Sequence, residues 1–299
     1  MQTKRIKRAV HGVLLLDKPF GFSSNQALQK IKWLYQAQKA GHTGTLDPLA
    51  TGVLPICLGE ATKFAQHLTD ENKTYIAAVK FGVTTTTGDK EGAVLREVTC
   101  NVQQHDIEAV LPALTGEITQ IPPMYSALKV DGKPLYEYAR EGVELERKPR
   151  QVTIYVLRLL DCQDNVANIE VTCSKGTYIR TLAEDIGQAL GVGAHLIGLR
   201  RTATATYQIA HTVTIEAVEA MTMEARDALL LPVDTAITAL PKVELHADAA
   251  YYFKQGNPVW LSGHIPDGEM RVYSEEGLFL GVGTQLANGR IAPKRVVNL

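Results

Sequence analysis

The sequence has little of what marks disulfide-bonded, metal-binding or membrane proteins. It contains only four cysteines in 299 residues, none in a C-x-x-C pair and none beside a histidine at metal-ligand spacing. The apolar run near its start, Val13 to Leu16, is shorter than the roughly 7–15 residues of a secretory signal, and no run approaches the roughly 18 of a membrane span. These absences predict a cytoplasmic protein with reduced cysteines, no structural zinc and no membrane partner.

An excess of charge of one sign is also missing. Lys and Arg number 31 against 32 Asp and Glu, which gives a formal net charge of -1. Overall composition therefore does not indicate a nucleic-acid partner. Residues 1–40 differ, because they carry eight basic side chains and a single acidic one, Asp17. Such a segment either faces a polyanion or is a solvated tail, and charge alone leaves both alternatives open.

Apolar periodicity predicts an α+β fold on a mainly antiparallel mixed sheet. Strands are predicted at 12–19, 53–59, 74–82, 117–123, 152–160 and 166–174, and helices at 27–35, 60–68, 105–114 and 177–190. Strands and helices do not alternate regularly, and no period of about 20–50 residues repeats. Residues 83–92 have the composition of a turn.

Two segments differ from this pattern and predict the domain organisation. Residues 122–151 form a polar connection rich in Gly and Pro, and a connection this long inside a domain is usually functional or disordered. From about Pro241 onward, short strands separated by turn residues predict a small β-barrel. We therefore expect a catalytic domain over 1–238 and a second domain over 239–299.

The least ordinary stretch is GHTGTLDPLATGVLPICLGEATK, residues 41–63. One interpretation is structural: Asp47 and Pro48 suit an N-cap and the first position of a helix, and His42 is then a loop residue. The other is functional, because a Gly-rich loop lets a ligand approach the backbone, and a carboxylate in it acts as a nucleophile or a base. The residues alone leave both open.

This stretch closely resembles the signature motif of the TruB family of tRNA pseudouridine synthases. Other segments resemble further family elements in the same order. They are LLLDKPFGFSSNQAL (14–28) for the KPxGxTS element, KTYIAAVKFGVTTTTGDKEG (73–92) for the Tyr-bearing strand and T-x-T-x-D-x-x-G turn, PPMYSALKVDGKPLYEYAREG (122–142) for the RNA-gripping insertion, CSKGTYIRTLAEDIG (173–187) for the Arg-bearing segment, and GAHLIGLRRTATATY (193–207) for the block that closes the site. Ser23 stands where threonine is usual. The tail resembles the family's small PUA-like domain, which binds RNA.

The resemblance implies a pseudouridine synthase fold and the isomerisation of uridine 55 in the T-loop of tRNA. The tRNA T-arm would be the partner, with no guide RNA, and we expect a monomer. The reaction gains no atom, so no cofactor is expected, neither redox group nor ATP nor metal. The insertion would be mobile without RNA and close over the T-arm.

By motif match, three residues would be catalytic. Asp47 would act at the ribose C1′, as a nucleophile or as a base that takes the C2′ proton. Arg180 would pair with Asp47 and keep the carboxylate charged. Tyr75 would lie against the flipped base and handle the proton at C5. On pattern alone, the favoured interpretations are a surface side chain for Arg180 and a core aromatic of a β-strand for Tyr75.

The resemblance also implies a set of substrate-binding and supporting residues. Tyr178 and Leu199 would contact the substrate, although both also suit ordinary packing. His42 would enter the T-loop near the extracted base. Lys18 and Pro19 match the family's KP pair beside the site, where Lys18 is expected to be structural or to contact the backbone.

Two other functions are weighed against this one. A carboxylate glycosidase acting on a nucleoside would need two carboxylates flanking the bond, and only Asp47 lies in the recognised loop. A tRNA-binding folding chaperone without essential catalysis would tolerate the loss of Asp47. Activity of an Asp47→Asn variant separates the enzyme from the chaperone.

Overall fold

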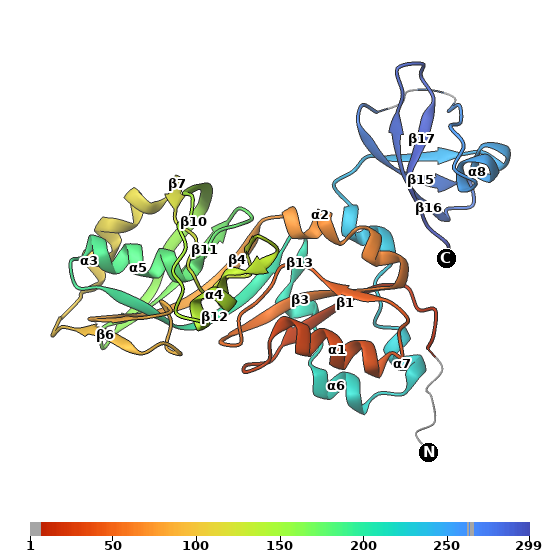
Figure 1. Ribbon diagram of the computed structural model, residues 1–299. Coiled ribbons are helices and arrows are strands. Elements are labelled where there is room, and N and C mark those ends of the chain that lie inside the picture. The colour runs from red at the N-terminus through yellow and green to blue at the C-terminus, as the bar shows by residue number, and fades with distance from the viewer. Residues whose placement is uncertain (1–6, 262, 264–265) are drawn as a thin grey trace.

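The computed structural model describes residues 7–261, 263 and 266–299. Lys4 and Arg5, two of the basic residues near the start, lie outside the described residues. Figure 1 shows a long body built around one large sheet, with a smaller module that carries the C-terminus attached at one end. Within the described residues these two parts contain nine-stranded and four-stranded sheets.

The large sheet is mixed and mainly antiparallel. Its order is β1 (Gly12–Lys18), β3 (Ala50–Leu58), β12 (Ala194–Thr204), β4 (Lys73–Phe81), β11 (Val166–Cys173), β10 (Arg150–Gln163) and β7 (Gly116–Gln120), with β2 (Ala40–His42) added to β3 and β13 (Tyr207–Gln208) to β12. The pairing of β3 with β12 is parallel, whereas the other pairings along this order are antiparallel. The α+β fold class predicted from the sequence is confirmed.

The apolar run of β1 and the even longer one of β3 are explained by helices on both faces of these strands (Figure 1). On one face, Leu14, Leu16 and Leu54 pack with α1 (Ser24–Leu34). On the other, Val13 and Val53 belong to a second core cluster with the segment around η1 (Gly59–Lys63) and α2 (Ala65–Asp70). A strand covered on both faces needs apolar side chains at every position. In β11, by contrast, buried and partly exposed residues alternate.

Outside the insertion, the remaining helices of the body are short, except the one over Ile179–Ala189, which has 11 residues. They are α3 (Gln104–Val110), η2 (Leu111–Leu114), α5 (Ile179–Ala189), η3 (Ile209–His211), α6 (Ile215–Ala220), α7 (Met223–Asp227) and η4 (Val233–Ile237). α5 buries Leu182, Ala183 and Ile186 in the main core. No helix in the part of the chain that the structure describes has both the length and the apolar character needed to cross a membrane.

Several predicted boundaries were wrong. The strand expected at 117–123 ends at Gln120, and β10 begins at Arg150, inside the predicted insertion. The helix expected at 105–114 changes to the tighter η2 at Leu111, where Pro112 has no N–H to continue the α-helical ladder. The turn-like segment 83–92 begins with β5 (Val83–Thr85), which pairs with β6 (Val94–Glu97).

The structural interpretation of Asp47 and Pro48 as a helix start was also wrong. The Ala50 amide donates to the Asp47 carbonyl at 3.0 Å, which closes a turn, and strand β3 follows at once. The residue before proline is biased toward extended conformation. Asp47 therefore lies at the entry to a central strand of the sheet.

The insertion carries little regular structure. It contains the two-strand ribbon β8 (Lys129–Val130) and β9 (Lys133–Pro134), followed by α4 (Leu135–Arg140). The backbone amides of Leu135 and Tyr136 donate to the carbonyls of Leu128 and Ser126 at 2.7 and 3.1 Å. These bonds fold the segment upon itself.

The C-terminal module has its own core, and its side chains also contact the body. β14 (Lys242–Leu245), β15 (Glu269–Ser274), β16 (Phe279–Gln285) and β17 (Ile291–Val296) form its sheet, with α8 (Ala247–Lys254) packed on it. Phe279 meets Phe64 of the body edge to face, with ring centroids 5.7 Å apart. The Tyr273 hydroxyl donates to the Asp234 carboxylate at 2.5 Å.

The parallel pairing of β3 with β12 requires a glycine at position 52. Gly52 has φ +104°, and a Cβ built there would lie 2.1 Å from the Arg201 carbonyl oxygen. Gly52→Ala is expected to lower the free energy of unfolding by about 2–4 kcal/mol, because two central strands must move apart. Thermal and urea unfolding measure the change.

Gly41→Ala is the matched control, because a Cβ there meets only a methyl group of Thr62 at 4.0 Å. It should unfold close to the wild type. Equal stability of the two alanine variants would contradict the role of Gly52.

Candidate active site

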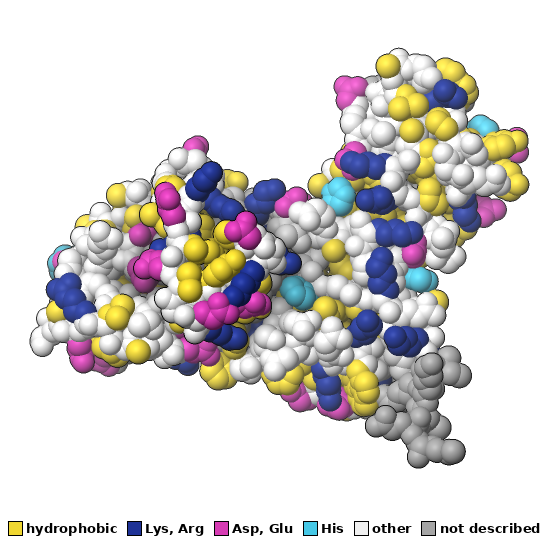
Figure 2. Space-filling view, viewed as in Figure 1, with side chains coloured by type: hydrophobic (Ala, Val, Ile, Leu, Met, Phe, Trp, Pro, Cys, Tyr) yellow, Lys and Arg dark blue, Asp and Glu magenta, His cyan; other side chains and the backbone are white. Residues whose placement is uncertain are grey.

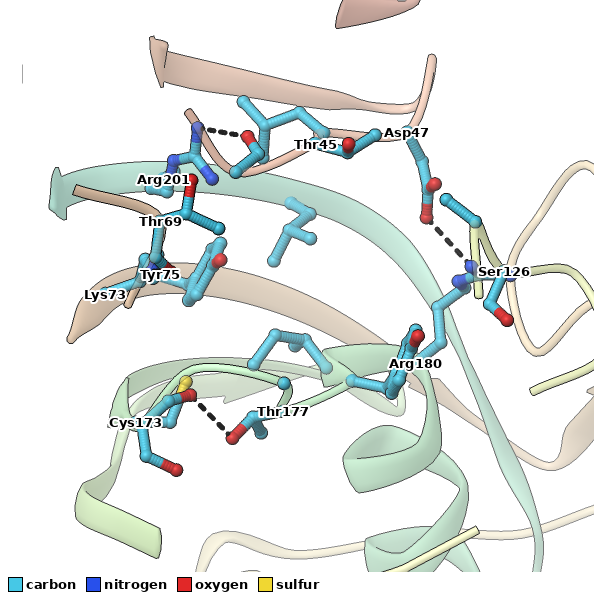
Figure 3. A pocket seen from close by; sticks show the side chains of 18 of the residues that line it. Thr45, Asp47, Thr69, Lys73, Tyr75, Ser126, Cys173, Thr177, Arg180 and Arg201 are labelled. Carbon is cyan, nitrogen blue, oxygen red and sulfur yellow. Dashed lines mark hydrogen bonds and ion pairs between the residues drawn. The ribbon is translucent and has the colours of Figure 1, made fainter. Parts of the chain in front are cut away.

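A cavity of about 390 Å³ opens where the β3–β12 junction, the start of α5 and the insertion meet (Figure 3). Five of the residues singled out in the sequence line it: Asp47, Tyr75, Tyr178, Arg180 and Leu199. Three others, His42, Lys18 and Pro19, do not. Tertiary structure thus brings together residues that are more than 150 positions apart in the chain.

The turn that carries Asp47 is fixed from the side of α1. The Ser24 hydroxyl, which is buried, accepts from the Leu46 amide at 2.8 Å and donates to the Leu46 carbonyl at 3.0 Å. The Gly21 amide donates to the Pro48 carbonyl at 2.9 Å. Residues on both sides of Asp47 are therefore held by the segment that resembles the KPxGxTS element.

Arg180 pairs with Asp47, and the two differ in exposure. The Arg180 Nη2 atom lies 3.0 Å from Oδ2 of Asp47, while the side chains are 7% and 43% exposed. Arg180 also donates to the carbonyls of Thr87 at 3.1 Å and Tyr125 at 2.6 Å, and its Nη1 lies 3.7 Å from a carboxylate oxygen of Asp89. Both terminal nitrogens of the buried guanidinium thus have acceptors, and of its two carboxylate partners only Asp47 is open to solvent.

Asp89 is a site residue that the sequence reasoning missed. Its buried carboxylate accepts from the Thr87 hydroxyl at 2.6 Å and from the Glu91 amide at 3.0 Å. The signal was present, because Asp89 is the acidic position of the T-x-T-x-D-x-x-G turn. Only the fold places that turn against Arg180.

Tyr75 lies beside a second buried arginine that was also missed. On β4, Tyr75 is opposite Arg201 of β12, and Figure 3 shows the two side by side, apart from the Asp47 and Arg180 pair. Arg201 donates to the Val53 carbonyl at 2.7 Å and the Gly44 carbonyl at 3.0 Å, and its nearby charge acts to lower the pKa of Tyr75. Burial nevertheless raises the pKa of Tyr75. The phenol is therefore protonated at neutral pH.

Two adjacent arginines in GLRRTATATY were the available signal for Arg201. Neighbouring side chains on a strand point to opposite faces. Accordingly Arg200 points outward to Asp17, at 2.7 Å, whereas Arg201 is fully buried. A Cβ at Gly44 would lie 3.2 Å from the Arg201 guanidinium, which explains a glycine there.

The backbone of Tyr178 is held by a residue of another strand. Gln120, at the end of β7, accepts from the Tyr178 amide at 3.0 Å and donates to the Tyr178 carbonyl at 3.3 Å. Tyr178 immediately precedes α5, two residues before Arg180. Burial raises the pKa of the Tyr178 hydroxyl. Gln120 therefore anchors the start of the helix that carries Arg180, and sequence reasoning missed it.

The predicted residues that do not line the cavity are buried or partly buried. Lys18 is fully buried, and its ammonium donates to the carbonyls of Pro19, at 3.0 Å, and of Phe22. Burial lowers the pKa of Lys18 to about 8, although the nearby Asp47 charge works in the opposite direction. His42 lies on β2, and burial lowers its pKa, so the imidazole is neutral at pH 7.

Nothing in the described residues is arranged as a metal site. Among them, no group of three His, Cys, Asp or Glu side chains converges. The four cysteines are free thiols, and burial raises the pKa of Cys57 to about 12 and that of Cys173 to about 11. Cys173 lines the cavity, but as a thiol it is a packing group.

Comparison with known proteins identifies the class. Three family models match in succession: "TruB family pseudouridylate synthase (N terminal domain)" over residues 32–179, "tRNA pseudouridylate synthase B C-terminal domain" over 180–238 and "Pseudouridine synthase II TruB, C-terminal" over 241–297. The fold, the cavity with its Asp47 and Arg180 pair, and these matches define a pseudouridine synthase.

Within that class, the chain belongs to the TruB family. A protein named tRNA pseudouridine synthase B from Methylobacillus flagellatus is 58% identical over 99% of this chain and 98% of its own length. The protein of the same name from Pseudomonas aeruginosa (strain UCBPP-PA14) is 50% identical over 99% of both chains.

Solved structures agree in fold. A chain in the crystal structure of a Cbf5-Nop10-Gar1 complex has a TM-score of 0.72 at 27% identity, covering 95% of this chain and 84% of that one. A chain of the archaeal box H/ACA sRNP Nop10-Cbf5 complex has a TM-score of 0.72 at 24% identity, covering 96% and 86%.

The Gln120 anchor yields a test of local structure. Gln120→Leu removes both side-chain hydrogen bonds and leaves the Tyr178 amide buried without a partner, which costs about 1–3 kcal/mol. The Tyr178 amide should exchange with deuterium faster, and the unfolding midpoint should fall. Hydrogen exchange followed by mass spectrometry of the peptide that contains Tyr178 measures this.

Thr119→Val provides the control on the same strand. The Thr119 hydroxyl is exposed and donates only to Gln151, at 3.3 Å. Exchange at Tyr178 should be unchanged in this variant. Unchanged exchange in Gln120→Leu as well would show that the anchor is not needed.

Proposed function

We propose that this chain isomerises uridine 55 in the T-loop of tRNA to pseudouridine, acting alone and without guide RNA or cofactor. The observation that carries the proposal is the solvent-open Asp47 carboxylate, 3.0 Å from the buried Arg180, in a cavity that Tyr75 also lines. The names of the relatives support tRNA as the substrate. The resemblance of residues 41–54 to the stand-alone bacterial branch supports position 55 and independence of a guide.

The chemistry needs one carboxylate beside the sugar. The bond between uracil N1 and ribose C1′ breaks, the base turns, and a new bond joins C5 to C1′. The C5 proton is lost and N1 gains one, so the atoms balance without an external reactant. Asp47 serves this sequence by bonding to C1′ or by taking the C2′ proton. Both routes require the carboxylate in its charged form.

Arg180 supplies a fixed positive charge beside that carboxylate, with its Nη2 atom 3.0 Å from Oδ2 of Asp47. Because Arg180 is held by Asp89 and by two backbone carbonyls, it does not have to move when substrate arrives. A charge that is already in place can stabilise the transition state without the free-energy cost of moving protein groups during the reaction.

Tyr75, Tyr178 and Leu199 form the proposed walls for the extracted base. Leu199 lies on β12 directly opposite Ala50 and Ala77, so its side chain is fixed by two neighbouring strands. The raised pKa of Tyr75 keeps its hydroxyl protonated. That weighs against Tyr75 as the first acceptor of the C5 proton and favours a role for its ring against the base.

To place its base in this cavity, the target nucleotide must leave its stack, which costs a few kcal/mol. We assign His42 to the space that the base vacates. A neutral imidazole is suited to this, because it can stack and hydrogen-bond between bases without carrying a charge. It sits on β2, which pairs with β3 a few residues beyond the Asp47 turn.

RNA affinity is expected from limited basic patches. Figure 2 shows Lys and Arg side chains in a column that runs along the body below the C-terminal module. Part of the basic N-terminal segment is already paired, because Arg8 contacts Asp227 and Lys30 contacts Glu219. Such exposed pairs are weak, so phosphates can compete for these cations.

The first test is release of tritium from [5-³H]uridine-labelled tRNA by the purified protein without metal, nucleotide or guide RNA. Release should occur, and replacing uridine 55 should abolish it. Asp47→Asn should reduce the rate by at least about a thousandfold, because the reacting carboxylate is lost. Asp248→Asn, on α8 of the C-terminal module, is the control and should retain activity.

The outcomes separate the alternatives. Wild-type activity in Asp47→Asn would exclude Asp47 as the catalyst. No release by the wild type, with tRNA still bound, would favour the chaperone function or a missing partner.

The insertion gives an independent prediction. Closure over the T-arm should protect the trypsin sites at Lys129 and Arg140, so cleavage there should slow at least severalfold when tRNA is added. A tRNA that lacks the T-arm is the control and should not protect. Equal cleavage with and without intact tRNA would count against closure.

A further inference from the structure

The loop between β1 and α1 exposes two phenylalanines close to the Asp47 turn. Phe20 is 58% exposed and Phe22 is 38% exposed. They flank Gly21, whose φ is +82°, and occupy the two positions that the KPxGxTS pattern leaves open. Single exposed apolar residues are ordinary on protein surfaces. Two aromatic rings on one short loop need a further reason.

This loop is fixed to the catalytic turn. The Gly21 amide donates to the carbonyl of Pro48, the residue after Asp47, at 2.9 Å. The buried Lys18 ammonium holds the same loop by donating to the carbonyls of Pro19 and Phe22. Because the backbone on each side of Phe20 is held in this way, the ring keeps a defined place relative to the Asp47 carboxylate.

A cation from the turn that carries Asp89 lies against Phe20. The Lys90 ammonium is 4.8 Å from the centroid of the Phe20 ring. Lys90 is exposed and follows Asp89, the partner of Arg180, and its amide donates to the Leu196 carbonyl at 2.9 Å. Phe20 and Lys90 therefore connect the two turns that supply Asp47 and Asp89.

An exposed aromatic face beside an exposed cation is how proteins bind unpaired nucleotides, since the ring stacks on a base and the cation meets a phosphate. We propose that Phe20 and Lys90 form a subsite for an unpaired nucleotide of the RNA that neighbours the extracted uridine. The Phe20 ring stacks on its base, and Lys90 pairs with its phosphate. This inference rests on the proposed function, since the ligand is the same RNA.

The kinetic test uses tritium release from tRNA. Phe20→Leu keeps an apolar side chain but removes the ring, and should raise KM about tenfold, in the range expected for loss of one stacked base, with kcat within about twofold. Phe20→Tyr restores a ring and should restore KM. Trp33→Leu is the control: Trp33 is an exposed aromatic with Lys30 5.4 Å from its ring, in the last turn of α1. It should leave KM unchanged.

Two binding measurements do not depend on turnover. Lys90→Gln should lower the slope of log affinity against log salt by about one unit, as for one lost phosphate contact. Trp fluorescence of Phe20→Trp, corrected by a titration of the wild type with its two tryptophans, should be quenched by a T-arm RNA hairpin.

The results distinguish this inference from the proposed function. If the wild type is active and Phe20→Leu has wild-type KM, the subsite is overturned while the synthase stands. If the wild type is inactive, the proposed function fails, and quenching of Phe20→Trp still decides whether a base stacks there. Unquenched fluorescence at saturating RNA would overturn the subsite in either case.

Discussion

The burial of one guanidinium organises the active site. Arg180 is 7% exposed, and a buried cation must be paired on nearly every donor to be tolerated. Its partners come from the turn at Asp47, the turn at Thr87 and Asp89, and the carbonyl of Tyr125 in the insertion. Three segments distant in sequence therefore meet at Arg180. Of its two carboxylate partners, Asp89 is buried and accepts hydrogen bonds from its own turn, whereas Asp47 remains accessible to a substrate.

The parallel pairing of β3 with β12 sets the other side of the cavity. It puts Leu199 and Arg201 opposite Ala50 and Gly52, immediately after the Asp47 turn. Arg201 is then close enough to Lys73 to add to the effect of burial, and together they lower the pKa of Lys73 to about 8. Lys73 and Arg201 thus line the cavity as positive groups, and Asp47 is the one acidic residue among its described lining. The arrangement suits a reaction that needs a charged carboxylate and an extracted nucleotide.

The acidic and basic side chains of this chain nearly balance in number, but they are unevenly distributed over its surface. The formal net charge is -1, yet basic side chains gather on particular surfaces (Figure 2). Charged side chains of the insertion form ion pairs with one another, Lys133 with Glu141 and Arg147 with Glu144. Under the proposed function, a surface of this kind would rely on the shape of the RNA and a few contacts more than on total charge.

Local patterns in the chain were enough to predict the α+β class and most strands of the large sheet, because strand burial is reflected in consecutive residues, as in 12–18. The five predicted residues of the cavity lining came instead from the resemblance of several motifs, such as 41–63, to the TruB family. The roles of Asp89, Gln120 and Arg201 were not predicted. The turn at Asp47 was not predicted either, because its sequence resembled a helix start. Each of these depends on a partner far along the chain: Asp89 and Gln120 on the segment around α5, and Arg201 on β3. No short window contains both members of such a pair, so only long-range packing fixes which polar groups are buried together and which carboxylate stays open.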